Sequence, residues 1–64
     1  MTNSLHTVYL FGALRVTVED HSGAIVAVQC SADGASAEGR YRAAYIAQAI
    51  AYAQRQHAAT HTEG

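Results

Sequence analysis

Hydrophobic residues recur with a helical period in the C-terminal part of the chain. The stretch 36–59 has no proline and consists mostly of residues that favour helices. On a helical wheel of about 100° per residue, small and branched apolar residues gather on one side. These are Ala43, Ile46, Ala47, Ala49, Ile50 and Ala53. The pattern predicts one amphipathic helix, over residues 37–57, whose apolar side can lie close against a sheet.

Upstream of that helix, the pattern changes to the alternation that is typical of strands. It predicts three strands, at about residues 5–11, 14–19 and 24–30. Gly12 is the first of two loop residues between the first two strands, which favours a type II′ hairpin. That hairpin would pair Phe11 with Leu14, Tyr9 with Val16 and Thr7 with Val18. The alternative is one long strand that bends at Gly12.

The segment DHSG, at residues 20–23, indicates a second hairpin. Aspartate suits the first position of a type I turn and glycine suits the left-handed position after it, which predicts a three-residue loop with a bulge. This hairpin would pair Val18 with Val26, Val16 with Val28 and Leu14 with Cys30. The face away from the helix would then carry His6, Val8, Leu10, Arg15, Thr17, Glu19, Ile25, Ala27 and Gln29.

Together these elements predict a single small α+β domain. A three-stranded antiparallel meander would pack against one C-terminal helix (β-β-β-α), with Ser36 as the helix N-cap, Glu38 in the first turn and a polar tail at 60–64. The 64 residues provide a small core. One helix covers only one face of the sheet, so the opposite face is more apolar than a solvated face requires.

Charge and composition narrow the functional classes. The net charge of −1 and four arginines make direct nucleic-acid binding an alternative rather than the first expectation. A small nucleic-acid-binding regulator would use Arg15, Arg40, Arg42 and Arg55. The single cysteine indicates a reducing compartment. With no signal-peptide pattern and no long apolar run, we expect no membrane contact and a cytoplasmic location. Abundant alanine, with arginine in place of lysine, is typical of a GC-rich bacterial or phage gene, so we expect a bacterial host cell.

Catalytic patterns are weak in this sequence. Cys30 could pair with His6 or His21, but its phase with the valines of its strand indicates a buried thiol. Glu19 and Asp20 are adjacent, so a strand would point their carboxylates to opposite faces. We therefore expect a protein that is not an enzyme and needs no cofactor.

Metal ligation is equally weakly indicated. His57 and His61 are four residues apart, a spacing that can place two imidazoles on one side of a helix. The run HAATH lacks the glutamate of an HExxH motif, and no nearby cysteine completes a ligand set. We expect no metal site and a solvated helix end at these residues.

Tyrosines mark one flank of the predicted helix. Tyr41, Tyr45 and Tyr52 fall within about 40° of one another on the wheel. Such tyrosines either line the edge of a core with their hydroxyls in water or form a binding surface, in which tyrosine is enriched. For a binding surface, Arg42 and Arg55 would supply a polar rim. Residues expected to meet basic groups of a partner are Glu19, Asp20 and Glu38.

The whole chain resembles the small anti-CRISPR proteins that phages encode. The strand runs YLFGALRVTVED and AIVAVQC, the helix run GRYRAAYIAQAIAYAQRQ and the lack of a catalytic pattern carry this resemblance. It implies a compact domain that inhibits a CRISPR effector by occupying its target-DNA recognition surface, with a subunit of a type I complex as the partner. Because this class shares no motif, it assigns no residue roles here. The near-neutral charge favours steric exclusion over imitation of DNA.

A third function is a structural homodimer. Two copies would pair through the open face of the sheet or through an edge strand. The expected function is thus a non-enzymatic protein-binding inhibitor, with a nucleic-acid-binding regulator and a homodimer as alternatives.

Overall fold

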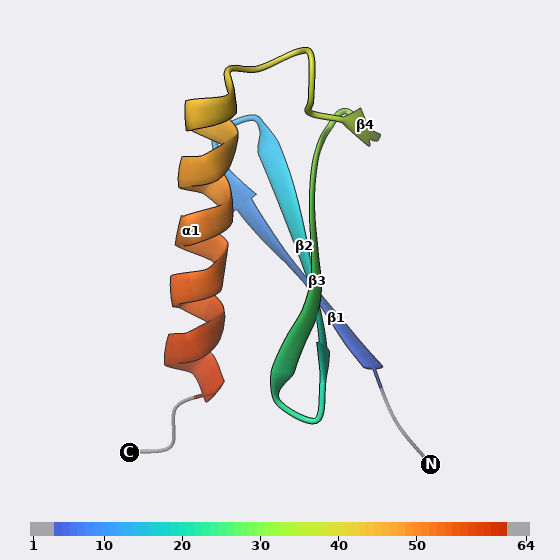
Figure 1. Cartoon of the computed structure of the whole chain (residues 1–64), viewed down its shortest axis with the longest axis vertical. Helices are drawn as coiled ribbons and strands as arrows, with labels where there is room; N and C mark the ends of the chain where they lie inside the picture. The colour runs from blue at the N-terminus through green and yellow to red at the C-terminus, as the bar shows by residue number, and fades with distance from the viewer. Residues whose placement is uncertain (1–3, 62–64) are drawn as a thin grey trace.

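The computed structural model describes residues 4–61, and the side chains of residues 4–60, as a four-stranded antiparallel sheet with one helix on one face (Figure 1). Strands that follow one another in the sequence are neighbours in the sheet. This confirms the predicted α+β meander with a C-terminal helix, and it adds a fourth strand. The elements are β1 Ser4–Phe11, β2 Leu14–His21, β3 Ala24–Ala32, β4 Ala35–Ser36 and α1 Ala43–His61.

The first hairpin has the predicted turn and register. Gly12 has a φ of 59°, whereas Ala13 is not left-handed, as a type II′ turn requires. The strands pair as predicted, with Phe11 opposite Leu14, Tyr9 opposite Val16 and Thr7 opposite Val18. The alternative of one bent strand is therefore wrong.

The turn of the second hairpin differs from the prediction. Ser22 and Gly23 form a two-residue turn, and their φ angles of 58° and 89° are both left-handed. This is the type I′ pattern, whose twist matches that of the flanking strands. The predicted three-residue loop is wrong, and β2 continues to His21 instead of ending at residue 19.

Despite the different turn, a bulge keeps most β3 side chains on the face of the sheet that the sequence predicted. The register shifts between Glu19 and Asp20, so that Asp20 pairs with Ile25 and Val26 is the extra residue. Val18 and Val16 therefore pair with Val28 and Cys30, two positions from the prediction. A shift of two keeps each side chain on its face. Ile25 is the exception, because its partner Asp20 lies on the helix side.

The segment predicted as a loop contains a third hairpin. Asp33 and Gly34 have φ angles of 54° and 79°, which again form a type I′ turn. They connect β3 to the short β4, where Ser31 pairs with Ser36 and Ala32 with Ala35. Ser36 is therefore a strand residue and not the predicted helix N-cap.

The helix begins six residues later than predicted. The N–H groups of Arg40 and Tyr41 both donate to the carbonyl of Ala37, which forms a single separate turn. Gly39 lies in this turn with a left-handed φ of 82°, so the turn does not continue into α1. The helix then extends to His61, beyond the predicted end at residue 57 and into the predicted polar tail, of which residues 62–64 lie outside the described part.

The core lies between β2 and α1. Val16 and Val18 of β2 are fully buried, and Ala49 and Ala53 of α1 pack against this layer. Because alanine is small, the helix axis can approach the sheet closely, as the sequence pattern predicted. Ala43 and Ala47, which the wheel placed on the same side, are exposed. In the part of the chain between residues 4 and 61, no helix has the length and apolarity to cross a membrane.

Candidate functional site

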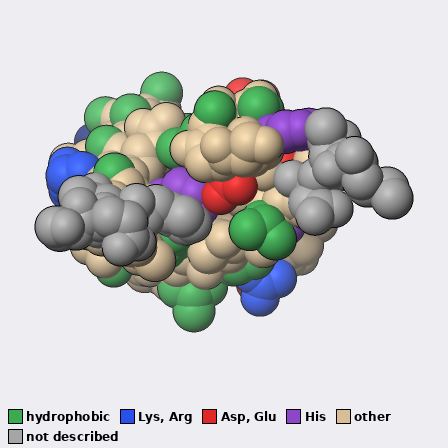
Figure 2. Space-filling model, turned by 90° about the horizontal axis from the view of Figure 1, so that it is seen from below, with side chains coloured by type: hydrophobic (Ala, Val, Ile, Leu, Met, Phe, Trp, Pro, Cys, Tyr) green, Lys and Arg blue, Asp and Glu red, His purple; other side chains and the backbone are tan. Residues whose placement is uncertain are grey.

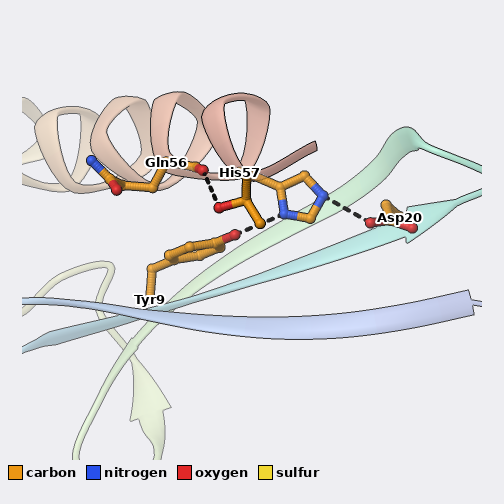
Figure 3. A network of polar contacts seen from close by, with 5 residues as sticks. Tyr9, Asp20, Gln56 and His57 are labelled. Atoms are coloured by element: carbon orange, nitrogen blue, oxygen red, sulfur yellow. Dashed lines mark hydrogen bonds and ion pairs between the residues drawn. The ribbon is translucent and has the colours of Figure 1, made fainter. Parts of the chain in front are cut away.

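A buried polar network connects the helix to two strands (Figure 3). The imidazole of His57, from α1, lies between the side chains of Tyr9, from β1, and Asp20, from β2. Its Nδ1 is 2.8 Å from the Tyr9 hydroxyl oxygen, and its Nε2 is 2.8 Å from Oδ2 of Asp20. His57 and Asp20 are each only 2% exposed. The three side chains thus form one chain of hydrogen bonds inside the fold.

Local structure places all three residues on the same side. Tyr9 pairs with the core residue Val16, and Asp20 follows Val18 on the face of β2 that meets the helix. His57 lies one helical turn after the buried Ala53. A histidine in phase with a buried alanine stripe, opposite an aspartate in phase with buried valines, was the sequence signal for this contact.

The order hydroxyl, imidazole, carboxylate matches the order of groups in a hydrolase triad. Here, however, the ring is reversed, because Nδ1 meets the hydroxyl and Nε2 meets the carboxylate, and the hydroxyl belongs to a tyrosine. Such an arrangement fixes the helix against the sheet. Asp20, predicted to meet a basic partner, therefore lies inside the fold, and His57, predicted at a solvated helix end, is buried.

The tyrosines of the predicted flank gather around Phe11. The rings of Tyr45 and Tyr52 lie 5.5 and 5.4 Å from the Phe11 ring, and the ring of Tyr41 lies 5.8 Å from that of Tyr45. All are half-buried. They form an aromatic cluster that closes one edge of the core. Part of each ring is still exposed, so a role of these tyrosines in binding stays a prediction.

The charged residues of the predicted set are dispersed. Arg42, Arg55 and Glu38 are exposed, and Arg42 immediately precedes α1. Glu19 lies on the open face of the sheet, where Nε2 of His6 is 3.6 Å from its carboxylate. The structure brings the three tyrosines together but does not join them to Glu19 in one surface.

A groove of about 600 Å³ runs between β3 and α1. Apolar side chains of Val28 and Cys30 line it from the sheet, and those of Ile46 and Ile50 line it from the helix. The remaining side chains of the lining are mostly polar: Thr17, Gln29, Ser31, Ser36 and Glu38. A volume of this size is within the range of sites that bind small molecules and peptide segments.

The outer edge of β3 forms one side of this groove. The N–H of Ala37 donates to the carbonyl of Cys30, which therefore faces away from β2. Because backbone groups alternate in direction along an antiparallel strand, the N–H and C=O groups of Val28 face the same way. Within residues 4–61, β4 and Ala37 cover β3 only from Cys30 onward, so no described strand lies beside residues 24–29.

The groove also contains the single cysteine. Cys30 is half-buried, and desolvation raises the pKa of its thiol above the ordinary value of 9.0. The thiol is therefore protonated at neutral pH and acts as a small apolar group in the groove wall. The predicted buried thiol is therefore only partly buried.

Apolar side chains are also exposed on the first strand. Leu5, Val8 and Leu10 of β1 are 58%, 50% and 66% exposed. The end-on view shows hydrophobic side chains standing out at the rim of the molecule (Figure 2). Val8 and Leu10 lie on the open face, and β1 is also an edge strand of the sheet.

No group of three His, Cys, Asp or Glu side chains in the described chain is arranged to hold a metal ion. Comparisons with protein-family models, with curated proteins and with solved structures find no match for this chain.

Proposed function

We propose that this chain is a non-enzymatic protein-binding module that captures an extended segment of a partner along the outer edge of β3. The observation that carries the proposal is the unpaired outer edge of β3 at residues 27–29, beyond the bulge at Val26, beside a groove of about 600 Å³ whose walls hold both apolar and polar side chains. A strand edge presents N–H and C=O groups in a row, and an extended backbone is the chemical group that complements such a row.

The binding mode follows from the alternation of backbone and side-chain directions along a strand. Backbone hydrogen bonds to Val28 and to the N–H of Cys30 would add the partner segment as a further strand. Every second side chain of that segment would then point toward α1, where Ile46 and Ile50 form the apolar wall. Small apolar side chains at alternate positions fit this groove best.

Charge adds a preference at one end of the groove. Glu38 is exposed beside the groove, and among the groove residues it carries the only formal charge. A lysine or arginine of the partner segment next to Glu38 would gain a favourable electrostatic contact. We propose an extended, alternately apolar segment with a basic residue at one end.

The anti-CRISPR resemblance names a first partner for this function. If the partner is a type I CRISPR effector complex, the captured segment belongs to one of its subunits. The bound domain would then sterically block the surface that recognises target DNA. The nucleic-acid-binding regulator receives less support, because the open face of the sheet carries Arg15 together with Glu19.

A peptide library displayed on phage tests the binding mode for any partner that supplies an extended segment. The library is selected on the wild-type protein and on Val28→Pro. Proline removes the outward N–H of Val28 but no hydrogen bond to β2. Because Val28 also packs against the core, circular dichroism first checks that this variant is folded. The matched control is Val8→Pro, which makes the same change on the outer edge of β1.

The proposal predicts enriched peptides with alternating apolar residues that bind the wild type and Val8→Pro but lose at least tenfold in affinity for Val28→Pro. N-methylation of the peptide at alternate residues should abolish binding. Equal binding to folded Val28→Pro, or no enrichment on the wild type, would refute strand addition at β3. A tagged pull-down of a purified type I effector complex then tests the specific partner, with the same two variants.

A further inference from the structure

We infer that β1 is a self-association edge, at which two copies of this chain pair antiparallel about a two-fold axis into one continuous sheet. The strand order is β1-β2-β3-β4, so the groove beside β3 lies at the opposite edge of the sheet from β1. The inference therefore concerns a second surface and does not depend on the proposed function.

The outer edge of β1 lacks the features that protect edge strands from pairing. Its sequence, SLHTVYLF, contains no Lys, Arg, Asp, Glu or Pro. All eight residues pair with β2 in unbroken register, so no bulge bends the strand away. Natural edge strands use charges, prolines or bulges to prevent association, and β1 has none of these.

Exposed apolar area is concentrated on this same strand. Of the five large hydrophobic residues that are exposed in the described chain, β1 supplies Leu5, Val8 and Leu10. Val8 and Leu10 point to the open face, which α1 does not cover. Addition of a strand at the β1 edge would cover part of their side chains, which gives the association a hydrophobic contribution.

The hydrogen-bonding phase of β1 identifies the pairing residues. Phe11 and Leu14 close the two-residue hairpin, so Phe11 and every second residue before it bond to β2. The N–H and C=O groups of His6, Val8 and Leu10 therefore face outward. A two-fold axis at Val8 places Val8 opposite its own copy and His6 opposite Leu10 of the second copy.

The charges beside this edge are compatible with a second copy as its occupant. On the open face, Arg15 of β2 lies beside Leu10, and Glu19 lies beside His6. In the two-fold pairing, Leu10 of one copy lies opposite His6 of the second copy. The row of side chains across the interface therefore begins at Arg15 of the first copy and ends at Glu19 of the second. Opposite charges thus stand at the two ends of every such row, and no like charges face each other.

Sedimentation of the full chain over a range of concentrations tests this inference. The expected result is a reversible dimer of the 6.8 kDa chain. Val8→Pro removes an outward N–H without breaking the β1–β2 ladder, and it should lower the association constant at least tenfold. Val28→Pro is the matched control and should remain dimeric.

Cross-linking of a cysteine variant tests the position of the two-fold axis without relying on a loss of dimerisation. Val8→Cys in a Cys30→Ser background places a single thiol at the proposed axis, and a short bismaleimide reagent should link two copies. The same reagent should fail with Thr17→Cys in that background, because Thr17 lies on β2. A wild type that stays monomeric, a Val8→Pro variant that stays dimeric, or equal cross-linking from both thiols would overturn the inference.

Discussion

Nε2 of His57 lies 2.8 Å from Oδ2 of Asp20, which joins the last turns of α1 to the end of β2 across 37 residues of sequence. Both side chains are almost fully buried. A hydrogen bond to a carboxylate in such surroundings is stronger than the same bond at the surface, and leaving either partner alone is unfavourable.

Replacement of His57 by alanine should therefore destabilise the protein severely. Removal of a buried hydrogen-bond partner typically lowers the free energy of unfolding by about 1–3 kcal/mol, and by more where the remaining group is charged. Urea unfolding followed by circular dichroism measures this change. Gln56→Ala, at the exposed neighbouring position, is the control and should stay within about 0.5 kcal/mol of the wild type. A loss below about 1 kcal/mol for His57→Ala would show that the network adds little.

A milder change separates the tyrosine from the rest of the network. Tyr9→Phe deletes only the hydroxyl that meets Nδ1 of His57, so unfolding should become easier by about 1 kcal/mol. Tyr52→Phe is the matched control, because in residues 4–61 the Tyr52 ring packs on Phe11 and its hydroxyl makes no hydrogen bond. Equal effects of the two substitutions in urea unfolding would contradict a specific role for the Tyr9 hydroxyl.

Gly12 should not tolerate a side chain, for two reasons that can be measured separately. Its φ of 59° is left-handed, and a Cβ at this position would collide with the hydroxyl of Tyr45. Gly12→Ala should lower the thermal midpoint by several degrees, since about 1 kcal/mol shifts a domain of this size by about 4–8 °C. In a Tyr45→Phe background the loss should shrink, because only the backbone strain remains. Additive effects of the two changes would exclude the predicted collision.

The Cys30 thiol should react slowly and make stability depend on pH in the alkaline range. Desolvation raises its pKa above 9.0 in the folded state, so folding favours the protonated thiol. The resulting stabilisation is complete below the pKa of the unfolded chain and is lost as the pH rises through the pKa of the folded state. Iodoacetamide labelling at pH 8 should be slower in the native protein than in urea. Cys30→Ser should reduce the alkaline dependence.

Much of the sheet could be predicted because local chemistry and tertiary packing agree there. Alternation in β2 and the glycine at position 12 both indicate the same hairpin, and its register was correct. At the second hairpin the same reasoning chose the wrong turn, because a Ser-Gly pair can adopt two left-handed conformations in succession. The bulge at Val26 then kept most side chains on the expected face.

The helix start was misplaced because tertiary contacts override helix propensity. Residues 37–42 contain good helix formers, yet Ala37 is buried and bonds to Cys30 at the edge of the sheet. Asp33-Gly34 is a strong hairpin signal, but its flanking residues are small and have little strand preference. A two-residue strand there is determined by pairing, not by composition.

The buried network was not predicted, for a different reason. His57 and Asp20 are polar, and each was assigned to the surface by residue type alone. Their positions in the helical and strand periods were the better guide, since both are in phase with buried residues. The three predicted tyrosines do form a cluster, but Tyr41 precedes α1 and contacts only the ring of Tyr45 in it. Phe11, which contacts the other two rings, comes from β1.

The two different edges of the sheet determine how this chain can polymerise. Pairing of β1 with β3 of the next copy would leave the same two edges open again, and a ribbon could grow without end. Pairing of β1 with itself consumes that edge in both copies and ends growth at two. The closed pair would then carry two β3 grooves at its opposite margins, so it could hold a repetitive partner at two points and dissociate from it far more slowly than one copy does.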